Sequence, residues 1–222
     1  MPILCFDTTT KVASVAVVEG DAVLCEASLG HVESHAARLL PMVDFALRQA
    51  NVKRQDIKQI AVGAGPGSFT GLRIGLSLAK GLAEGLAVPL VLLSTLEVLA
   101  HAASLHPGVV IPLLDAQRQE YYAAAFKCGQ GEFTRLSHDM VVKKEEFAVW
   151  AHSFASPVLL TGEAAPLAEH ATGFFVARAF LSAPRAAIVG ILSQGRTPTD
   201  PKCALPNYIR TSSAQPKKGG LS

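Results

Sequence analysis

The sequence GPGSFTGLR, from Gly65 to Arg73, joins two segments of different hydrophobic pattern, and this junction indicates how the first half of the chain folds. The residues before it, Gln59–Ala64, have the composition of a buried strand, and Gly71–Glu84 after it has the spacing of a helix. A second apolar run, Pro89–Leu93, and a helical pattern over Thr95–Ala103 follow. Because strands that alternate with helices usually pair in parallel, the sequence predicts an α/β fold.

Three apolar runs come before this unit and predict an antiparallel meander. They are Ile3–Phe6, Val12–Val18 and Ala22–Ser28. From about Ser34 the pattern changes to helical spacing, which extends to Ala50. We expect Pro41 to kink this helix or to lie in its first regular turn.

The second half of the chain repeats the opening of the first. A strand over Val109–Leu114, a polar turn at Asp115 and a strand around Tyr121–Lys127 match the opening strand, Asp7 and second strand, which indicates a duplicated fold. The remainder predicts short helices and one strand, Val158–Thr161. We expect an N-terminal lobe over residues 1–103, a smaller C-terminal lobe over 104–210 and a flexible tail over 211–222.

The composition favours a soluble protein that binds a partner. Lys and Arg number 20 and Asp and Glu 18, so no strong field attracts nucleic acid or a membrane. The apolar run Leu86–Leu93 is too short to span a bilayer, and Met1–Asp7 has no basic leader, which predicts a cytoplasmic location. The low charged fraction, 17%, predicts apolar surface. The four cysteines form no CxxC pair and predict neither a disulfide framework nor a zinc site.

The glycine loop lies where backbone amides at a helix N-terminus can face an anion. It is not a standard phosphate loop, because Leu72 and Arg73 follow Gly71 where that loop has Lys and Ser or Thr. Two interpretations stay open. Either Gly65, Gly67 and Ser68 bind phosphate, or the glycines form a tight turn that the helix approaches closely.

The helix after this loop carries little polar surface. Arg73, Ser77, Lys80 and Glu84 form one narrow polar stripe, and glycine, alanine and leucine occupy the rest. Such a helix is covered on two sides. The second cover is either another helix of the same chain or a helix of another subunit.

Two histidines, His31 and His35, stand four residues apart, which is the spacing by which a helix face binds zinc. Glu33 stands one position later than in the protease motif, and no third ligand follows. We therefore expect ordinary histidines and no metal site.

Asp7 and Asp115 each end a strand near the start of a half. Such aspartates, with Thr8 and Thr9, can hold magnesium on a nucleotide between two lobes. Glycines should follow the second aspartate, but Ala116–Gln119 follows instead. The sequence therefore indicates a two-lobed nucleotide site of which half is lost.

Several motifs together resemble the TsaB family, formerly YeaZ. They are Phe6-Asp7-Thr8-Thr9, His35 with Leu39-Leu40-Pro41, GPGSFTGLRIG from Gly65 to Gly75, Ser94–Glu97, Asp115–Tyr122 and Pro206–Arg210. The resemblance spans most of the chain and is weak from about Leu136 to Arg196.

This resemblance implies an actin-like, Hsp70-like ATPase (ASKHA) fold in two lobes, related to the catalytic subunit TsaD. It implies a non-catalytic subunit that forms a heterodimer with TsaD, helps to recruit the ATPase TsaE, forms a homodimer when alone, and meets tRNA only through the complex. No cofactor of its own is implied, and ATP or ADP is a candidate ligand at the interface with partners. TsaD has a metal-binding His-x-x-x-His after the strand that corresponds to Pro89–Leu93, where this chain has Ser94–Ala100.

The family pairs through helices of the first lobe, which here are Ser34–Ala50 and Gly71–Glu84. The partner-binding residues predicted on these helices are His35, Leu39, Val43, Leu47, Gly71, Arg73, Gly75, Leu78, Ala79 and Leu82. We expect Gly75→Leu to block the pairing by overfilling a close helix contact.

Two alternatives to the subunit hypothesis remain. One is an independent ATPase or small-molecule kinase that uses Asp7, Thr8, Thr9 and Asp115. The other is a metallopeptidase that uses His31 and His35, which stoichiometric zinc would support.

Overall fold

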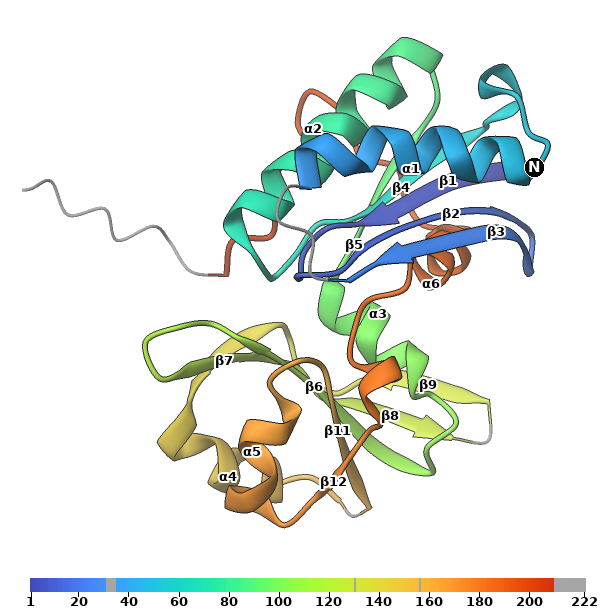
Figure 1. The fold of residues 1–222 in the computed structure, drawn as a ribbon. Helices are drawn as coiled ribbons and strands as arrows, with labels where there is room; N and C mark the ends of the chain where they lie inside the picture. The colour runs from blue at the N-terminus through green and yellow to red at the C-terminus, as the bar shows by residue number, and fades with distance from the viewer. Residues whose placement is uncertain (31–34, 130, 156, 210–222) are drawn as a thin grey trace, which may run out of the picture.

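A computed structural model describes residues 1–30, 35–129, 131–155 and 157–209 and contains two sheets (Figure 1). The first is five-stranded with the order β3-β2-β1-β4-β5. The second is seven-stranded, with the path β10-β7-β6-β11-β12 and with β8 and β9 paired beside it. We call the first sheet with its covering helices the first lobe, and the second sheet with its helices the second lobe.

The first sheet begins with the predicted meander, which the structure confirms. β1 (Pro2–Asp7) pairs antiparallel with β2 (Ala13–Glu19), and β2 pairs antiparallel with β3 (Ala22–Leu29). β4 (Gln59–Gly63) lies parallel to β1, and β5 (Leu90–Leu93) lies parallel to β4, as the alternation of strand and helix predicts. The carboxyl ends of these three parallel strands therefore meet at one edge of the sheet.

Helices cover both faces of the first sheet. α1 (His35–Gln49) and α2 (Phe69–Leu86) pack on one face, and α6 (Ala186–Ser193) packs on the other. The Ser68 hydroxyl caps α2 by accepting from the Gly71 amide, so this helix begins two residues earlier than predicted. Pro41 lies inside α1.

α3 (Thr95–Ala102) lies between the lobes (Figure 1). Its Val98 packs with the first sheet and α6, whereas Leu96 and Leu99 pack with β6 and β8 of the second sheet. One short helix thus contributes to the cores of both lobes.

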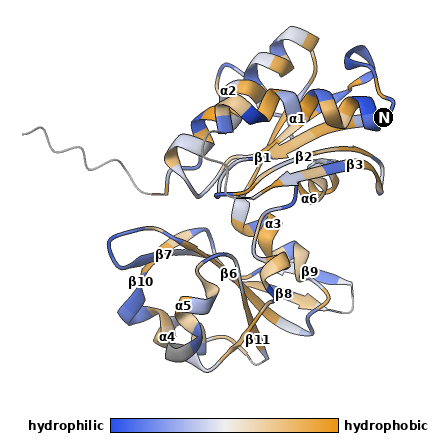
Figure 2. Ribbon diagram, viewed as in Figure 1, coloured by the Kyte–Doolittle hydropathy of each residue, from blue (hydrophilic) through white to orange (hydrophobic). Residues whose placement is uncertain are grey.

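The second lobe contains more strands than the sequence predicted. Its strands are β6 (Gly108–Asp115), β7 (Glu120–Ala123), β8 (Phe126–Gly129), β9 (Glu132–Arg135), β10 (Met140–Lys143), β11 (Val158–Thr161) and β12 (Phe175–Val176). Its helices are α4 (Lys144–His152) and α5 (Ala165–Thr172). The strand predicted over Tyr121–Lys127 is wrong as one element, because β7 pairs with β10 and the end of β6, whereas β8 pairs with β9 and the start of β6. Hydrophobic residues concentrate in the central strands β6 and β11, and the β6–β7 turn is hydrophilic (Figure 2).

After the second lobe the chain returns to the first. α6 lies against β1 and β2, the Thr199 amide donates to Leu90 O at 2.7 Å, and the Asn207 amide donates to Ala64 O at 2.7 Å. These residues fall within the range 104–210 that the sequence assigned to one C-terminal lobe, yet they lie on the first sheet. The boundary at residue 104 itself stays a prediction. The tail predicted over 211–222 is outside the described residues.

No helix in the described ranges has the length and apolar character that crossing a membrane requires.

Candidate functional site

The turn that follows β1 is buried and held by its own polar groups. Asp7, Thr8 and Thr9 are 0%, 1% and 1% exposed. Asp7 Oδ1 accepts from the Thr9 amide at 2.8 Å and from the Thr9 hydroxyl at 2.7 Å. The turn is the one predicted as a possible nucleotide site, and both donors of Thr9 are used within it.

The glycine loop lies directly on this turn. The Ser68 amide donates to Thr9 O at 2.7 Å, and the Thr8 hydroxyl donates to Gly71 O at 2.8 Å. A Cβ on Gly67 would lie 2.3 Å from Thr9 O, and a Cβ on Gly71 would lie 1.9 Å from Thr8 O. The glycines are therefore needed for close approach to the chain's own backbone, which is the second of the two interpretations left open by the sequence.

Burial has a strong effect on the Asp7 carboxyl. Loss of water raises its pKa to about 6, and the hydrogen bonds from Thr9 only partly oppose this. Asp7 Oδ2 has no hydrogen-bond partner among the described residues and faces Gly63, whose added Cβ would lie 1.8 Å away. The carboxyl group is therefore enclosed by atoms of the chain itself, and its role as a magnesium ligand stays a prediction.

Asp115 ends β6 in the second lobe and is only half buried. Its Oδ1 accepts from the Gln117 amide at 3.1 Å and lies 3.8 Å from Lys144 Nζ. Gln117, Arg118 and Gln119 all have positive φ, a conformation that glycine adopts more easily. The turn keeps the strand–Asp–turn plan predicted from the repeat, with bulky residues where a phosphate would approach.

The structure buries six of the ten predicted partner-binding residues inside the first lobe. They are Leu39, Val43, Leu47, Gly71, Gly75 and Ala79. Leu39, Val43, Leu47 and Ala79 pack in the core of the first lobe, and Gly71 and Gly75 face Thr8. Val43 and Leu47 also line a groove at the surface of this lobe, so a role of these two residues in binding a partner stays a prediction. A Cβ on Gly75 would lie 2.4 Å from Thr8 Oγ1, so the expectation that Gly75→Leu reports on pairing is corrected: it would first disturb the chain's own packing.

The remaining four lie nearer the surface. Arg73 is exposed, and His35, Leu78 and Leu82 are half buried. His35 Nε2 contacts Thr10 O at 3.0 Å, and its Nδ1 has no hydrogen-bond partner among the described residues. His31 lies outside the described residues. Within the described ranges, no three His, Cys, Asp or Glu residues are grouped as a metal site would require.

A groove between α1 and α2 is lined by Val43, Leu47 and Leu82, which the sequence predicted to bind a partner, and by apolar residues that the sequence did not single out. It has a volume of about 130 Å³, and its lining includes Leu40, Leu82 and Leu86. Leu40 is 49% exposed, and Phe45 on the same helix is 45% exposed. The periodicity identified the stripe of α1 that faces the sheet, whereas the exposed apolar residues lie just beside that stripe. Whether this face binds a partner stays a prediction.

The two lobes, each built on a sheet that opens with a strand, an aspartate and a second strand, place the chain among proteins with the actin-like ATPase fold. Solved structures agree. The ethanolamine utilization protein EutJ from Carboxydothermus hydrogenoformans matches with a TM-score of 0.52 at 11% identity, over 86% of this chain and 89% of that one. At that identity the likeness concerns the fold alone.

More similar relatives identify the family. The sequence model of the family TsaD, tRNA N6-adenosine threonylcarbamoyltransferase, matches residues 31–171. YeaZ from Pseudomonas aeruginosa matches with a TM-score of 0.75 and 26% identity over 93% of this chain and 99% of that one. The tRNA threonylcarbamoyladenosine biosynthesis protein TsaB of Bacillus subtilis is 29% identical over 98% of this chain and 97% of its own length. TsaB of Escherichia coli is 40% identical over 57% of this chain and 55% of its own. The chain belongs to the TsaD family and, within it, to the TsaB (YeaZ) proteins.

Proposed function

We propose that this protein is a non-catalytic subunit of the bacterial machinery that forms threonylcarbamoyladenosine in tRNA. In this proposal it binds and stabilises the catalytic subunit TsaD through the exposed face of α1 and α2. It also helps to recruit the ATPase TsaE, and it meets tRNA only through the complex. Its relatives in B. subtilis and E. coli carry the name of this biosynthesis, which supports a role in the same process.

The observation that carries the non-catalytic part is the filled turn after β1. Ser68 and Gly71 occupy the surface of Thr8 and Thr9 that a nucleotide phosphate would need. Asp7 is enclosed beneath them. A chain with this arrangement has no use for Asp7 as a magnesium ligand, which also disfavours an independent ATPase or kinase. Any ATP or ADP would bind at an interface with a partner.

The partner surface is supported by the groove between α1 and α2. Its lining is mostly apolar, with Asp44 and Arg54 at its rim, and the half-exposed Leu40 contributes to it from α1. Two helices that leave such a groove can accept the apolar face of helices from another subunit. The same face would serve a homodimer when the partner is absent.

The direct test is size-exclusion chromatography with light scattering on this protein mixed with TsaD from the same organism. A one-to-one complex is expected, and the protein alone should show no ATP hydrolysis. Elution of both proteins unchanged would contradict the subunit proposal. Magnesium-dependent hydrolysis by the pure chain that is lost in Asp7→Asn would support the ATPase instead.

A pair of variants tests the surface. Leu40→Glu places a charge in the groove at a residue that is already 49% exposed, so the fold should persist while the complex weakens by at least about tenfold. The control is Val149→Glu on α4, where the side chain is 79% exposed in the second lobe. Equal binding by the two variants would remove the groove from the proposal.

A further inference from the structure

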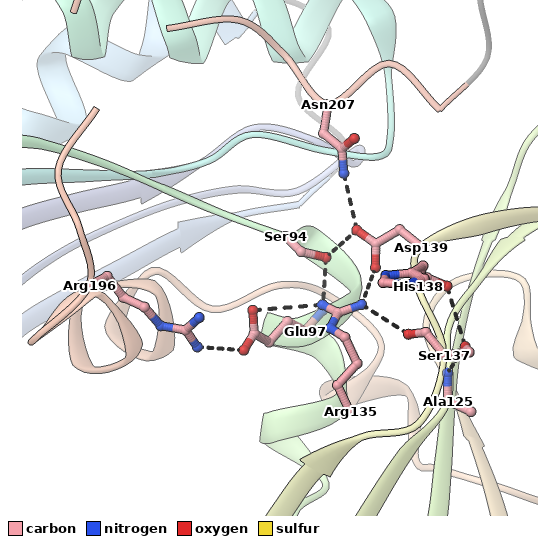
Figure 3. Close-up of polar contacts among 9 residues, drawn as sticks. All are labelled: Ser94, Glu97, Ala125, Arg135, Ser137, His138, Asp139, Arg196 and Asn207. Carbon is pink, nitrogen blue, oxygen red and sulfur yellow. Dashed lines mark hydrogen bonds and ion pairs between the residues drawn. The ribbon is translucent and has the colours of Figure 1, made fainter. Parts of the chain in front are cut away.

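A polar network crosses from one lobe to the other (Figure 3). Ser94 and Glu97 begin α3 next to the first sheet, and Arg135 and Asp139 stand at the end of β9 and before β10 in the second. Arg196 and Asn207 belong to the closing part of the chain that returns to the first lobe. The six residues come from three segments that are far apart in the sequence, so only the fold brings them together.

All four carboxylate oxygens of the network are used. Asp139 Oδ1 accepts from Arg135 at 2.6 Å, and Oδ2 accepts from Ser94 at 2.7 Å and from Asn207 at 3.1 Å. Glu97 Oε1 accepts from Arg196 at 2.6 Å, and Oε2 lies 3.7 Å from an Arg135 nitrogen. Two carboxylates and two guanidinium groups balance one another. The network is therefore complete without a metal ion or a further charged ligand.

The central members are shielded from water. The side chains of Asp139 and Glu97 are 9% and 13% exposed, and Arg135 is 31% exposed and lies over the ring of Phe126 at 4.6 Å. Charge pairs that are shielded and hydrogen-bonded at both ends are costly to break singly, because the remaining charge is left unpaired. Exposed pairs such as Lys127–Glu132 do not share this property.

Asn207 connects this network to the glycine loop. Its side chain donates to Asp139, and its amide donates to Ala64 O, directly before the loop. The next residue, Tyr208, stacks on Phe69 at 5.6 Å, and Arg73 Nε donates to its hydroxyl at 3.4 Å. The second lobe thus reaches the start of α2 through two consecutive residues.

We propose that this network locks the two lobes at one angle and that Asn207 joins the lock to the start of α2. Two-lobed proteins commonly hinge around a bound ligand. In this chain the glycine loop packs on the turn after β1, where a nucleotide would bind. In our proposal, side chains from both lobes set the angle between the lobes instead of a bound ligand. The proposal concerns the chain alone and stands or fails independently of TsaD binding.

The test measures the distance between spin labels on the two lobes by pulsed electron paramagnetic resonance. Labels at Gln49, exposed on α1, and Val149, exposed on α4, report the angle, with Cys25 and Cys203 replaced by serine. The labelled protein with an intact network should give one narrow distribution of label-to-label distances, and Mg-ATP should not change it. Asp139→Ala should broaden it at least about twofold, and the matched control Glu132→Ala should not. The proposal would be wrong if the distance distribution stayed narrow in Asp139→Ala. It would also be wrong if Mg-ATP narrowed the distribution of the labelled protein with the intact network.

Hydrogen exchange tests the connection to α2 and guards against a variant that fails to fold. Asn207→Ala removes only the bond from the closing segment. It should speed exchange of the residue-207 amide and of the amides in the first turn of α2 about tenfold, and it should leave the β1 amides unchanged. If Asp139→Ala does not fold, this variant decides alone. Faster exchange confined to residues 207 and 208 would contradict the connection.

Discussion

The backbone amide of Ser68 lies 2.7 Å from the carbonyl oxygen of Thr9, so the glycine loop and the turn after β1 form one packed unit. The loop comes from the segment between β4 and α2, and the turn from the segment between β1 and β2. Their contact fixes where α2 begins relative to the sheet. It also leaves the Ser68 amide with a partner inside the chain.

This contact predicts opposite effects for two glycines of α2. Gly71→Ala should lower the free energy of unfolding by about 2–3 kcal/mol, because its Cβ would meet Thr8 O at 1.9 Å. Gly81→Ala meets nothing within 4 Å and should raise it by about 0.5–1 kcal/mol through helix propensity. Urea denaturation followed by circular dichroism measures both. Equal effects of the two substitutions would show that the loop does not rest on the turn as described.

Gly75→Leu and Leu40→Glu should fail in different ways. The added side chain at Gly75 meets Thr8 Oγ1 and Val62 inside the lobe, so this variant should lose at least about 2 kcal/mol of stability. Leu40→Glu should keep its melting temperature within a few degrees and lose only self-association or TsaD binding. Thermal denaturation together with light scattering separates the two outcomes. A stable Gly75→Leu chain that no longer pairs would restore Gly75 to the partner surface.

Asp7 makes the stability depend on pH. Burial raises its pKa from 3.8 to about 6, so the folded state binds the proton more tightly than the unfolded state. Its contribution to stability is therefore full below pH 3.8 and is lost as the pH rises through 6. Asp7→Asn keeps the acceptor for Thr9 and cannot ionise. Between pH 4 and pH 8 its stability should improve relative to the wild-type chain by about 2 kcal/mol.

Denaturant titrations at the two pH values measure this difference. The control is the same substitution, Asp21→Asn, in the exposed β2–β3 turn. A relative stability of Asp7→Asn that does not vary with pH would mean that Asp7 is not enclosed as described.

Glu26 on β3 should be important for the attachment of α6. Its Oε1 accepts from the Ala187 amide at 3.0 Å and its Oε2 accepts from Arg185 Nε at 3.1 Å, at the start of that helix. Glu26→Ala should cost about 1–3 kcal/mol, because a buried amide and a cation lose their acceptor. Glu19→Ala, which removes only an exposed pair with the N-terminus, should cost no more than about 0.5 kcal/mol. Equal losses in urea denaturation would contradict this attachment.

Local pattern predicted most of the first lobe. The meander, the parallel strands and the helices α1 and α2 follow from the period of the hydrophobic residues and from the turn residues. Both signals depend on a few neighbours in sequence. The same reasoning found the turn at Asp7 and the loop at Gly65–Gly71. It left open what the glycines approach, because the answer depends on a contact between segments about 60 residues apart.

Other features depend on tertiary contacts that no local pattern records. Ala124 and Ala125 do not mark a strand break in the sequence, yet β7 ends before them, β8 begins after them, and the pairing partners change there. The apolar residues of α1 are visible in the sequence, but the sequence does not show which of them face the sheet: Leu39 is buried, whereas the next residue, Leu40, is half exposed. The pairing of Arg135 with Glu97 likewise joins residues whose separation hides them from any motif.

The placement of α6 has a consequence for synthesis on the ribosome. The face of the first sheet that carries Ile3, Cys5 and Val18 is covered mainly by α6, which begins at Ala186, with Val98 of α3 beside it. The ribosome makes a chain from its N-terminus at about 5–20 residues per second, and domains fold as they emerge. About 100 residues separate the end of β5 from the end of α6. This apolar face therefore stays open to water, and to chaperones, for about 5–20 seconds after its strands have been made, and the first lobe to be made is the last to be finished.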